Sequence, residues 1–497
     1  MDIIDALHSK TVFGPLFKKR ETWAAWEVYL RALFGLGLKD AAGLDLFKAC
    51  TGLEAAPSGK VRESFVICGR RSGKSYISAV IAAYLAAFKD WRPYLSPGER
   101  GWIFIIANDK QQAGIIKAYV SGIFQRVACL KSLIEKETVE TLELRNGVNI
   151  AVKTASFRSL RGYTVLCAIL EEIAFWRSEE SANPDKEILA AVRPALATIP
   201  DSLLIGISTP YSRAGVLFDM FKAYYGQAGG PLIWKAPTTT MNPTIDKALI
   251  ARAIAEDPQA AASEWGSDWR QDIEAFITPE LVEAVTVPGR FELPRIEGVE
   301  YFGFADPSGG RQDSFTLGIA HAEKSGKIVL DVLRERRPPF QPEAVVGEYC
   351  DVLKSFGVSQ IVADRYAGEW VTAAFRKHNI TVDASEQTAS ELYIELLPLI
   401  SNGMAELLDL KRLAGQLTGL ERRTRPGGKD MVTHYPGGHD DCANAAAGVL
   451  GAAFRSITQP GVQCFSLHDP NDPPWPQRRG IGEPAPKIGD MSRGFFR

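Results

Sequence analysis

An apolar run, a glycine-containing turn and a lysine-serine pair follow one another in residues 61–75, VRESFVICGRRSGKS. This order predicts a buried strand, a tight turn, and a helix whose positive N-terminal end points at the turn. Gly69 and Gly73 allow backbone N–H groups to face an anion, Lys74 supplies a positive charge, and Ser75 supplies a hydroxyl for Mg²⁺. The segment therefore predicts an α/β domain that holds the phosphates of a nucleotide.

Two features distinguish this turn from the usual G-x-x-x-x-G-K-[ST] pattern. Cys68 stands at the first glycine position, and Arg70 and Arg71 lie inside the loop. An ordinary glycine turn is the alternative interpretation, but the strand pattern before it and the helix pattern after it favour a phosphate-binding loop. The nucleotide-binding candidates in this segment are Gly69, Arg70, Arg71, Ser72, Gly73, Lys74 and Ser75.

A second strand is predicted at 165–172, VLCAILEE, where an apolar run ends in two acids. Acids at the C-terminal end of a strand in a parallel sheet lie in the crevice where ligands bind. We expect Glu171 to hold the metal of the nucleotide through water and Glu172 to polarise the attacking water. ATPases with a phosphate-binding loop more often carry Asp at the position of Glu171. Which of the two acids holds the metal and which polarises the water therefore stays open. The alternative is a strand followed by a solvated loop.

A third strand is predicted at 202–210, SLLIGISTP, which is apolar until Ser208 and Thr209. Hydroxyl groups at a strand end beside the phosphates can sense whether the γ-phosphate is present. Ser-Thr-Pro is also a common way for a chain to leave a strand, so both interpretations stand.

The C-terminal half shows three strand-like runs followed by alternating helix and strand patterns. This succession is that of an RNase H-like fold, in which the acids that end the first and fourth strands lie side by side. The first run, 299–306, ends in Asp306, and the fourth ends in Asp364. A final helical pattern at 437–454 opens with an Asp-Asp pair and brings a third carboxylate to the same place.

Three carboxylates without a Cys or His cluster suit Mg²⁺ or Mn²⁺, and a pair of such ions can promote phosphodiester cleavage. This indicates a nuclease. Each acid also has an ordinary structural role, Asp306 in a turn and Asp440 and Asp441 at the start of a helix. Adjacent helical residues point about 100° apart, so only one of the last two can face the metals, and we favour Asp441. Asp313 is a further candidate ligand.

Six segments occur in a characteristic order along the chain: GRRSGKS, LEEIAFW, ISTP, FADPSGG, IVADRY and GHDDCANA. In this order and spacing they resemble the large subunit of a tailed-phage terminase, the motor-nuclease that packages viral DNA, over most of the chain. The resemblance implies an ASCE-type P-loop ATPase domain, a parallel sheet with helices on both faces, followed by an RNase H-like nuclease domain. It implies ATP with Mg²⁺ in the first and two Mg²⁺ or Mn²⁺ ions in the second. The implied partners are double-stranded DNA, a portal protein, a terminase small subunit and further copies of the chain in a homo-oligomeric ring, a pentamer in the family.

The resemblance also implies roles for individual residues of the motor. Arg70 would act in cis on the γ-phosphate, while Lys74 and Ser75 bind phosphate and metal. Glu172 would be the catalytic acid, and the Ser208-Thr209 pair would couple hydrolysis to movement. For the nuclease centre, the resemblance implies Asp306, Asp364 and one of Asp440 and Asp441.

Two arginines, Arg158 and Arg161, precede the acid-bearing strand in the segment ASFRSLRGYT. Family resemblance favours Arg161, which is followed by Gly162, as an arginine donated to the phosphates of a neighbouring subunit. An arginine that contacts DNA or is simply solvated is the alternative.

Composition sets limits on these interpretations. A chain of 497 residues exceeds what one hydrophobic core supports and predicts two or more domains. With 46% apolar residues and a net charge of −2, it has no global basic excess, so DNA binding has to come from local patches. The candidates, which could equally form a solvated face, are Lys411, Arg412, Arg422, Arg423, Arg425 and Lys429.

The seven cysteines include no C-x-x-C pair, which argues against zinc and against a disulfide framework. The sequence shows no secretory signal and no apolar run long enough to span a bilayer. We therefore expect a protein of the host cytoplasm that does not bind membranes.

Composition shifts also predict the division of the chain. The expected segments are a helical part packed on the motor at 1–60, the ATPase domain at 61–276, a linker at 277–298, the nuclease domain at 299–456 and a disordered Pro- and Gly-rich tail at 457–497. Trp23, Trp26, Tyr29 and Phe34 form an aromatic stripe in the first segment that is more typical of a core than of an adenine site. The tail either docks on a partner such as the portal or solvates the terminus.

The function predicted from these features is ATP-driven translocation of double-stranded DNA into a procapsid, with metal-dependent cutting of concatemeric DNA. One alternative is a DNA repair helicase-nuclease, which would need a second P-loop-like sheet that residues 211–298 do not suggest. The other is a DNA-binding assembly protein with an inactive site, which the presence of every expected catalytic residue argues against.

Overall fold

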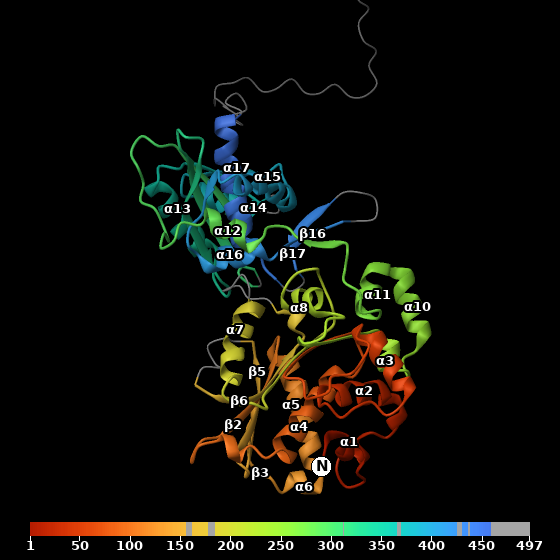
Figure 1. Ribbon diagram of the computed structural model, residues 1–497. Coiled ribbons are helices and arrows are strands. Elements are labelled where there is room, and N and C mark those ends of the chain that lie inside the picture. The colour runs from red at the N-terminus through yellow and green to blue at the C-terminus, as the bar shows by residue number, and fades with distance from the viewer. Residues whose placement is uncertain are drawn as a thin grey trace, which may run out of the picture.

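The chain forms two α/β bodies, which Figure 1 shows one above the other in a computed structural model. The structure describes residues 1–155, 162–176, 184–311, 313–364, 369–424, 430–435 and 438–458. The N-terminal body, red through yellow, lies below, and the C-terminal body, green through blue, lies above. Among the described residues, no helix combines the length and apolar character needed to cross a membrane.

The N-terminal body is built on an eight-stranded sheet in the order β3-β4-β5-β2-β6-β7-β1-β8. Six strands are parallel: β1 (Glu63–Cys68), β2 (Gly101–Ala107), β5 (Val148–Thr154), β6 (Thr164–Glu171), β7 (Leu203–Ser208) and β8 (Leu232–Ala236). An antiparallel hairpin of β3 (Ile134–Glu137) and β4 (Thr141–Leu144) extends one edge. One strand, β7, separates the phosphate-loop strand β1 from the acid-bearing strand β6, which is the ASCE arrangement predicted for this sheet.

Helices cover both faces of this sheet because its central strands are apolar on both sides. Val66 and Cys68 of β1 face a core shared with the first helices of the chain, whereas Phe65 and Ile67 face a second core. The first face is covered by α1 (Ile3–His8), α2 (Ala24–Leu33), α3 (Ala41–Thr51), α4 (Lys74–Phe88) and α5 (Lys110–Arg126), with α6 (Ala128–Lys131) at its edge. The second face is covered by α7 (Pro184–Leu196) and α8 (Val216–Tyr224).

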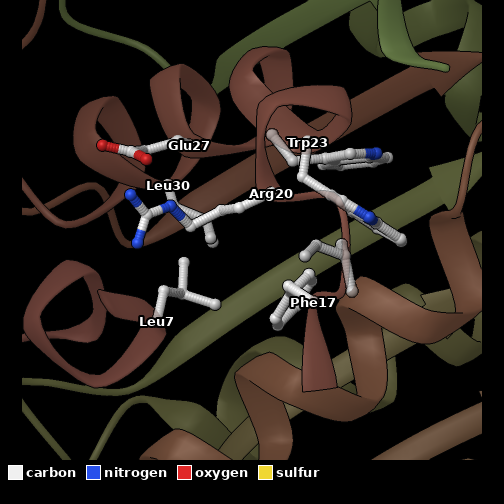
Figure 2. Close-up of a pocket in the computed structure, with 8 residues that line it drawn as sticks. Leu7, Phe17, Arg20, Trp23, Glu27 and Leu30 are labelled. Carbon is white, nitrogen blue, oxygen red and sulfur yellow. The ribbon is translucent and has the colours of Figure 1, made fainter. Parts of the chain in front are cut away.

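The aromatic stripe of the N-terminal segment lies in the first core. Trp26 is almost fully buried there. Figure 2 shows Leu7, Phe17, Trp23 and Leu30 converging on a small cavity. Its volume is about 10 Å³, which is room for one water molecule and far too little for an adenine ring. Short 3₁₀ turns at Gly14–Leu16, Arg20–Trp23 and Arg92–Tyr94 connect the neighbouring helices.

After β8 the chain forms three short helices and then pairs with the C-terminal body. The helices are α9 (Thr238–Met241), α10 (Lys247–Glu256) and α11 (Pro258–Glu264). The next strand, β9 (Ile273–Ala275), pairs with β16 (Leu420–Arg423), which in turn pairs with β17 (Met431–His434). A three-stranded sheet in the order β17-β16-β9 therefore joins the two bodies.

The segment after β9 belongs to the hydrophobic core of the C-terminal body. It contains α12 (Pro279–Val285), which lies within the residues predicted to form a linker, 277–298. Its core residues are Phe276, Ile277, Val282 and Val285. The connection between the bodies is therefore structured where it meets the C-terminal body, and the division of the chain into domains stays a proposal.

The C-terminal body is built on a six-stranded sheet in the order β14-β13-β10-β11-β12-β15. An antiparallel meander is formed by β10 (Tyr301–Asp306), β11 (Phe315–Ala322) and β12 (Ile328–Arg336). The strands β13 (Gln360–Ala363), β14 (Thr381–Ala384) and β15 (Ala405–Glu406) are parallel to their neighbours. With β13 beside β10, this is the strand order of an RNase H-like fold, and it confirms the fold predicted for this half.

Five helices cover the second sheet. On one face lie α13 (Pro342–Ser355) and α14 (Glu369–Arg376). On the other lie α15 (Ala389–Ser401), α16 (Lys411–Thr418) and α17 (Asp441–Thr458). The small residues of α17 bring its backbone against the meander: a Cβ at Gly448 would lie 2.4 Å from a ring carbon of Phe304 on β10.

We predict that Gly448→Ala destabilises the C-terminal body by about 1–3 kcal/mol, because the added methyl has to displace a buried aromatic ring. The matched control is Gly122→Ala in α5, where a Cβ meets no atom within 4 Å. The control should gain up to about 1 kcal/mol from helix propensity. Urea unfolding followed by circular dichroism compares the two, and equal stability of Gly448→Ala and the unmodified chain would contradict the close packing of α17.

Candidate active sites

The phosphate loop is a tight turn between β1 and α4. Arg71 and Gly73 have left-handed backbone conformations, with φ of 61° and 93°, which reverse the chain within a few residues. A Cβ at Gly69 would lie 2.2 Å from the Thr238 hydroxyl oxygen, so only glycine fits there. α4 then begins at Lys74, and its first backbone N–H groups face the end of the loop.

Side chains from outside the loop fix its carbonyl oxygens. The donors are Trp26 Nε1 to Ser72 at 2.7 Å, Thr238 Oγ1 to Arg70 at 2.8 Å and Asn242 Nδ2 to Arg71 at 2.8 Å. Because these carbonyls are held by α2 and by the α9 region, the loop conformation is set by both ends of the N-terminal body.

Lys74 is buried at the centre of the site, with 6% of its side chain exposed. Its ammonium donates hydrogen bonds to the carbonyl oxygens of Cys68 and Gly69, at 3.2 and 3.1 Å, and to the hydroxyl of Thr209, at 2.8 Å. It also lies 3.4 Å from a carboxylate oxygen of Glu172. The lysine therefore connects the phosphate loop with the ends of β6 and β7.

Glu171 ends β6 next to the start of α4, and it is fully buried. Its Oε2 accepts a hydrogen bond from Ser75 at 3.2 Å, while its Oε1 is buried with no hydrogen-bond partner among the described residues. Burial raises the pKa of this carboxyl to about 7. A hydroxyl beside a carboxylate with an unpartnered oxygen is a donor set that suits Mg²⁺.

Glu172 follows in a strained left-handed conformation, with φ of 52°. Its Oε2 accepts hydrogen bonds from the Ser208 hydroxyl at 3.0 Å and from the Thr209 backbone N–H at 3.1 Å. The strained backbone turns this carboxylate toward the end of β7, beside the lysine. The structure thus brings together the predicted acid and the predicted Ser-Thr pair.

Arg70 lies at the open side of the loop, with 57% of its side chain exposed. Its guanidinium is 3.2 Å from the carboxylate of Glu264, and its backbone N–H donates to the Glu264 carbonyl at 2.6 Å. Glu264, at the end of α11, therefore holds this arginine at the rim of the site. Arg158 and Arg161 lie outside the described residues, and with them the prediction that Arg161 acts on a neighbouring subunit.

In the C-terminal body, Asp306 ends β10 and Asp364 follows β13, its neighbour in the sheet. The amide of Asn444, on α17, donates to both carboxylates, at 2.9 and 3.0 Å. Burial is the largest cause of a pKa for Asp306 well above the ordinary value; the hydrogen bond from Asn444 opposes it, and the charges of Asp364 and Asp441 add to it. Several buried acids thus crowd around one neutral amide.

The two adjacent acids at the start of α17 have different surroundings. Asp440 accepts a hydrogen bond from the buried hydroxyl of Tyr393 at 2.8 Å. Asp441 is buried, and its Oδ2 has no hydrogen-bond partner among the described residues. Burial, followed by the charge of Asp440, raises the pKa of Asp441 to about 6. These contacts favour Asp441 over Asp440 as the third acid of the centre. Asp313 is exposed and lies 3.6 Å from His439.

The acids do not form a closed cage for a cation. Within the described part of the chain, no group of three or more His, Cys, Asp or Glu side chains is positioned to hold a metal ion. The amide of Asn444 bridges Asp306 and Asp364, which keeps their charges apart. The donor set still fits Mg²⁺ or Mn²⁺, because it contains only oxygen ligands and leaves a buried carboxylate oxygen of Asp441 unpaired.

The basic cluster predicted to contact DNA is only partly exposed. Arg412 is partly buried, and its Nε lies 2.6 Å from a carboxylate oxygen of Glu335. Arg422, on β16, lies over the ring of Phe276, with its guanidinium carbon 5.4 Å from the ring centre. Arg425 and Lys429 lie outside the described residues.

Sequence analysis missed three groups that hold these sites. Asn444 is one helical turn beyond Asp440 and Asp441, and this spacing of three to four residues on one helix face was an available signal. Glu264 and Tyr393 carry no local signal, because the residues that they contact are far away in the sequence.

No protein-family model matches this chain, and no curated protein does. Among solved structures, the large terminase of bacteriophage HK97 is 16% identical, with a TM-score of 0.35, and the match covers 80% of this chain and 92% of that one. The large terminase ATPase domain of a Thermus phage is 20% identical, with a TM-score of 0.33, over 42% and 89%. The large terminase nuclease of the thermophilic phage G20c is 16% identical, with a TM-score of 0.30, over 35% and 96%. All three are large terminases or parts of them, the family whose motifs this sequence resembles.

We predict that Asp306→Asn raises the melting temperature of the protein by about 2–5 °C in EDTA at pH 7.5. The pKa of the Asp306 carboxyl is higher in the folded protein than in the unfolded chain, because the side chain is buried. At pH 7.5 this difference lowers the free energy of unfolding, and asparagine, which cannot ionise, removes the penalty. Mn²⁺ should raise the melting temperature of the unmodified protein and have little effect on the variant. Differential scanning calorimetry checks both.

The control for this experiment is Asp351→Asn on the exposed face of α13, which should behave like the unmodified protein with and without Mn²⁺. A lower melting temperature for Asp306→Asn in EDTA would mean that the ionised carboxylate stabilises the fold and that the acids do not repel one another.

Proposed function

We propose that the chain is the large subunit of a viral terminase: an ATPase that drives double-stranded DNA into a procapsid and a metal-dependent endonuclease that cuts concatemeric DNA. The observation that carries the proposal is the presence of both centres in one chain. Lys74, Glu172 and Thr209 meet at the end of a P-loop sheet, and Asp306 and Asp364 meet at the end of an RNase H-like sheet.

In the motor, the phosphate loop would bind the triphosphate of ATP through its backbone N–H groups and Lys74. Ser75 and Glu171 would hold Mg²⁺, which supplies charge neutralisation of the phosphates. Glu172 would orient and polarise the attacking water, and its contacts with Ser208 and Thr209 would change as the γ-phosphate leaves. This pair would thereby couple hydrolysis to movement.

In the nuclease, Asp306, Asp364 and Asp441 would hold two Mg²⁺ or Mn²⁺ ions, which supply activation of water and stabilisation of the leaving oxygen. Asp440 would be held aside by Tyr393. Asn444 would keep Asp306 and Asp364 in place, because its amide contacts both.

The proposed assembly is a homo-oligomeric ring, a pentamer, on the portal protein of a procapsid in the host cytoplasm, with a terminase small subunit to select DNA. Arg70 would act on the γ-phosphate of its own subunit and Arg161 on that of a neighbour. The proposed division is a helical segment at 1–60, the motor at 61–276, a connection at 277–298, the nuclease at 299–456 and the tail at 457–497.

A helicase-nuclease is disfavoured by the connection between the bodies. Residues 211–298 are all described, and they contain only the short strands β8 and β9. A second P-loop-like sheet, which a helicase of that type needs, is absent from this described range.

We predict that the two activities separate by mutation. Lys74→Ala removes the charge at the centre of the phosphate loop and should abolish ATP hydrolysis while leaving plasmid cleavage in Mn²⁺ intact. Asp306→Ala should abolish cleavage and leave the basal ATPase rate within about twofold, because the acid lies in the other body. Phosphate release and supercoiled-plasmid assays on the full chain measure the two rates. Cleavage by Asp306→Ala at the unmodified rate would show that the acid centre is assigned wrongly.

We further predict that Glu172→Gln slows ATP hydrolysis by about 10²–10³-fold and retains ATP binding. Glutamine keeps an oxygen that can accept from Ser208 and Thr209 but cannot polarise water as a carboxylate does. Single-turnover hydrolysis and equilibrium binding of ATP distinguish these effects. A variant that hydrolyses ATP normally would move the catalytic role to another group.

A further inference from the structure

A cavity of about 580 Å³ lies between the two bodies, at the edge of the phosphate site. Arg70 and Thr209 line it from the motor side, and Arg423 and Tyr435 line it from the nuclease side. Phe175 and Tyr211 add aromatic rings, whose centres are 5.2 Å apart. The space that adjoins the phosphate loop is therefore bounded in part by residues of the other domain.

Arg423 is the positively charged group that the nuclease side contributes to this cavity. Its Nη2 donates to Glu421 at 3.0 Å. Its Nε is buried and has no hydrogen-bond partner among the described residues. Its neighbour on β16, Arg422, is on the opposite side of the strand and lies over Phe276, away from the cavity. A guanidinium that lines a cavity beside a phosphate-binding loop is suited to an anionic ligand.

The position of Arg423 relative to the phosphate loop is fixed by direct contacts. Tyr211, two residues beyond Thr209, donates its hydroxyl to Glu421 at 3.0 Å, the same carboxylate oxygen that accepts from Arg423. Arg423 also pairs with Ile273 of β9 in the joining sheet. The strand that carries Arg423 is thus attached both to the end of β7 and to the chain that leaves the motor.

We propose that Arg423 contacts the terminal phosphate of a nucleoside triphosphate across this cavity, so that the nuclease domain completes the ATP site of its own subunit. The inference rests on the proposed function of the phosphate loop. The terminal phosphate carries up to two negative charges, and Lys74 is the buried cation that the loop itself provides. Arg70 and Arg270 line the cavity from the side of the N-terminal body, and Arg423 adds a cation at the opposite wall. This cation adds affinity for the triphosphate that a diphosphate, which ends short of it, does not gain.

A phosphodiester of DNA offers the same chemistry, but the lining favours the nucleotide. Two of the lining residues, Arg70 and Thr209, belong to the phosphate site, and Thr209 is hydrogen-bonded to Lys74. The anion that reaches this cavity from the phosphate loop is the outer end of a bound triphosphate.

The test compares Arg423→Ala with Arg422→Ala, using the full chain, Mg²⁺ and two ligands, the non-hydrolysable ATP analogue AMP-PNP and ADP. Isothermal titration calorimetry gives the dissociation constants. We expect Arg423→Ala to bind AMP-PNP about 10- to 100-fold more weakly and ADP unchanged, whereas Arg422→Ala binds both like the unmodified protein. Arg423→Lys should recover part of the lost affinity.

Other outcomes overturn the inference in distinguishable ways. An equal loss for both ligands, or a fall in melting temperature that Arg422→Ala does not share, means that Arg423 supports the structure only. Unchanged AMP-PNP binding with weaker binding of nucleotide-free protein to a DNA duplex assigns the arginine to DNA. Failure of the unmodified chain to bind either nucleotide overturns the proposed function of the phosphate loop itself.

Discussion

The parallel pairing of β7 between β1 and β6 is the constraint on which the motor site depends. The register sets Ile67 of β1 opposite Ser208 and Glu171 of β6 opposite Ile207. All three strands therefore end at the same edge of the sheet, and the residues that follow them meet there. The ammonium of Lys74 lies among these ends and contacts Thr209. Without the inserted strand, neither the Ser208 hydroxyl nor the Thr209 backbone N–H would lie beside Glu172.

The carboxylates of the two centres differ in the charge of the group that contacts them. In the N-terminal body, the positive charge of Lys74 lies beside Glu172, and the Ser75 hydroxyl contacts Glu171. In the C-terminal body, the group shared by Asp306 and Asp364 is the neutral amide of Asn444, which holds both carboxylates in place and carries no charge of its own. The first arrangement presents a positive loop to a polyanion. The second presents negative charge to cations. The physical character of each centre follows from the one residue at its middle.

Sequence alone was sufficient for features encoded locally. The phosphate loop, the acids that end strands and the fold class of each body follow from short patterns, and the structure has these elements in the predicted order along the chain. Contacts between distant segments carried no such pattern. Glu264 reaches Arg70 only because α11 folds back over the loop, and Glu421 reaches Tyr211 across more than two hundred residues. The packing of α12, within the predicted linker at 277–298, is a contact of the same kind, because its partners in the core lie far away in the sequence.

The joining sheet gives the connection between the bodies a mechanical character. β9 is hydrogen-bonded along β16, so the chain that leaves the motor is a strand of the hairpin that faces it. A force that separates the two bodies would act on all of these backbone hydrogen bonds at once, and also on the contact between Tyr211 and Glu421. A flexible linker could accommodate a small movement at the end of β7 without moving the second body. A paired strand is stiffer than such a linker, because moving one body relative to the other has to break or shear its backbone hydrogen bonds.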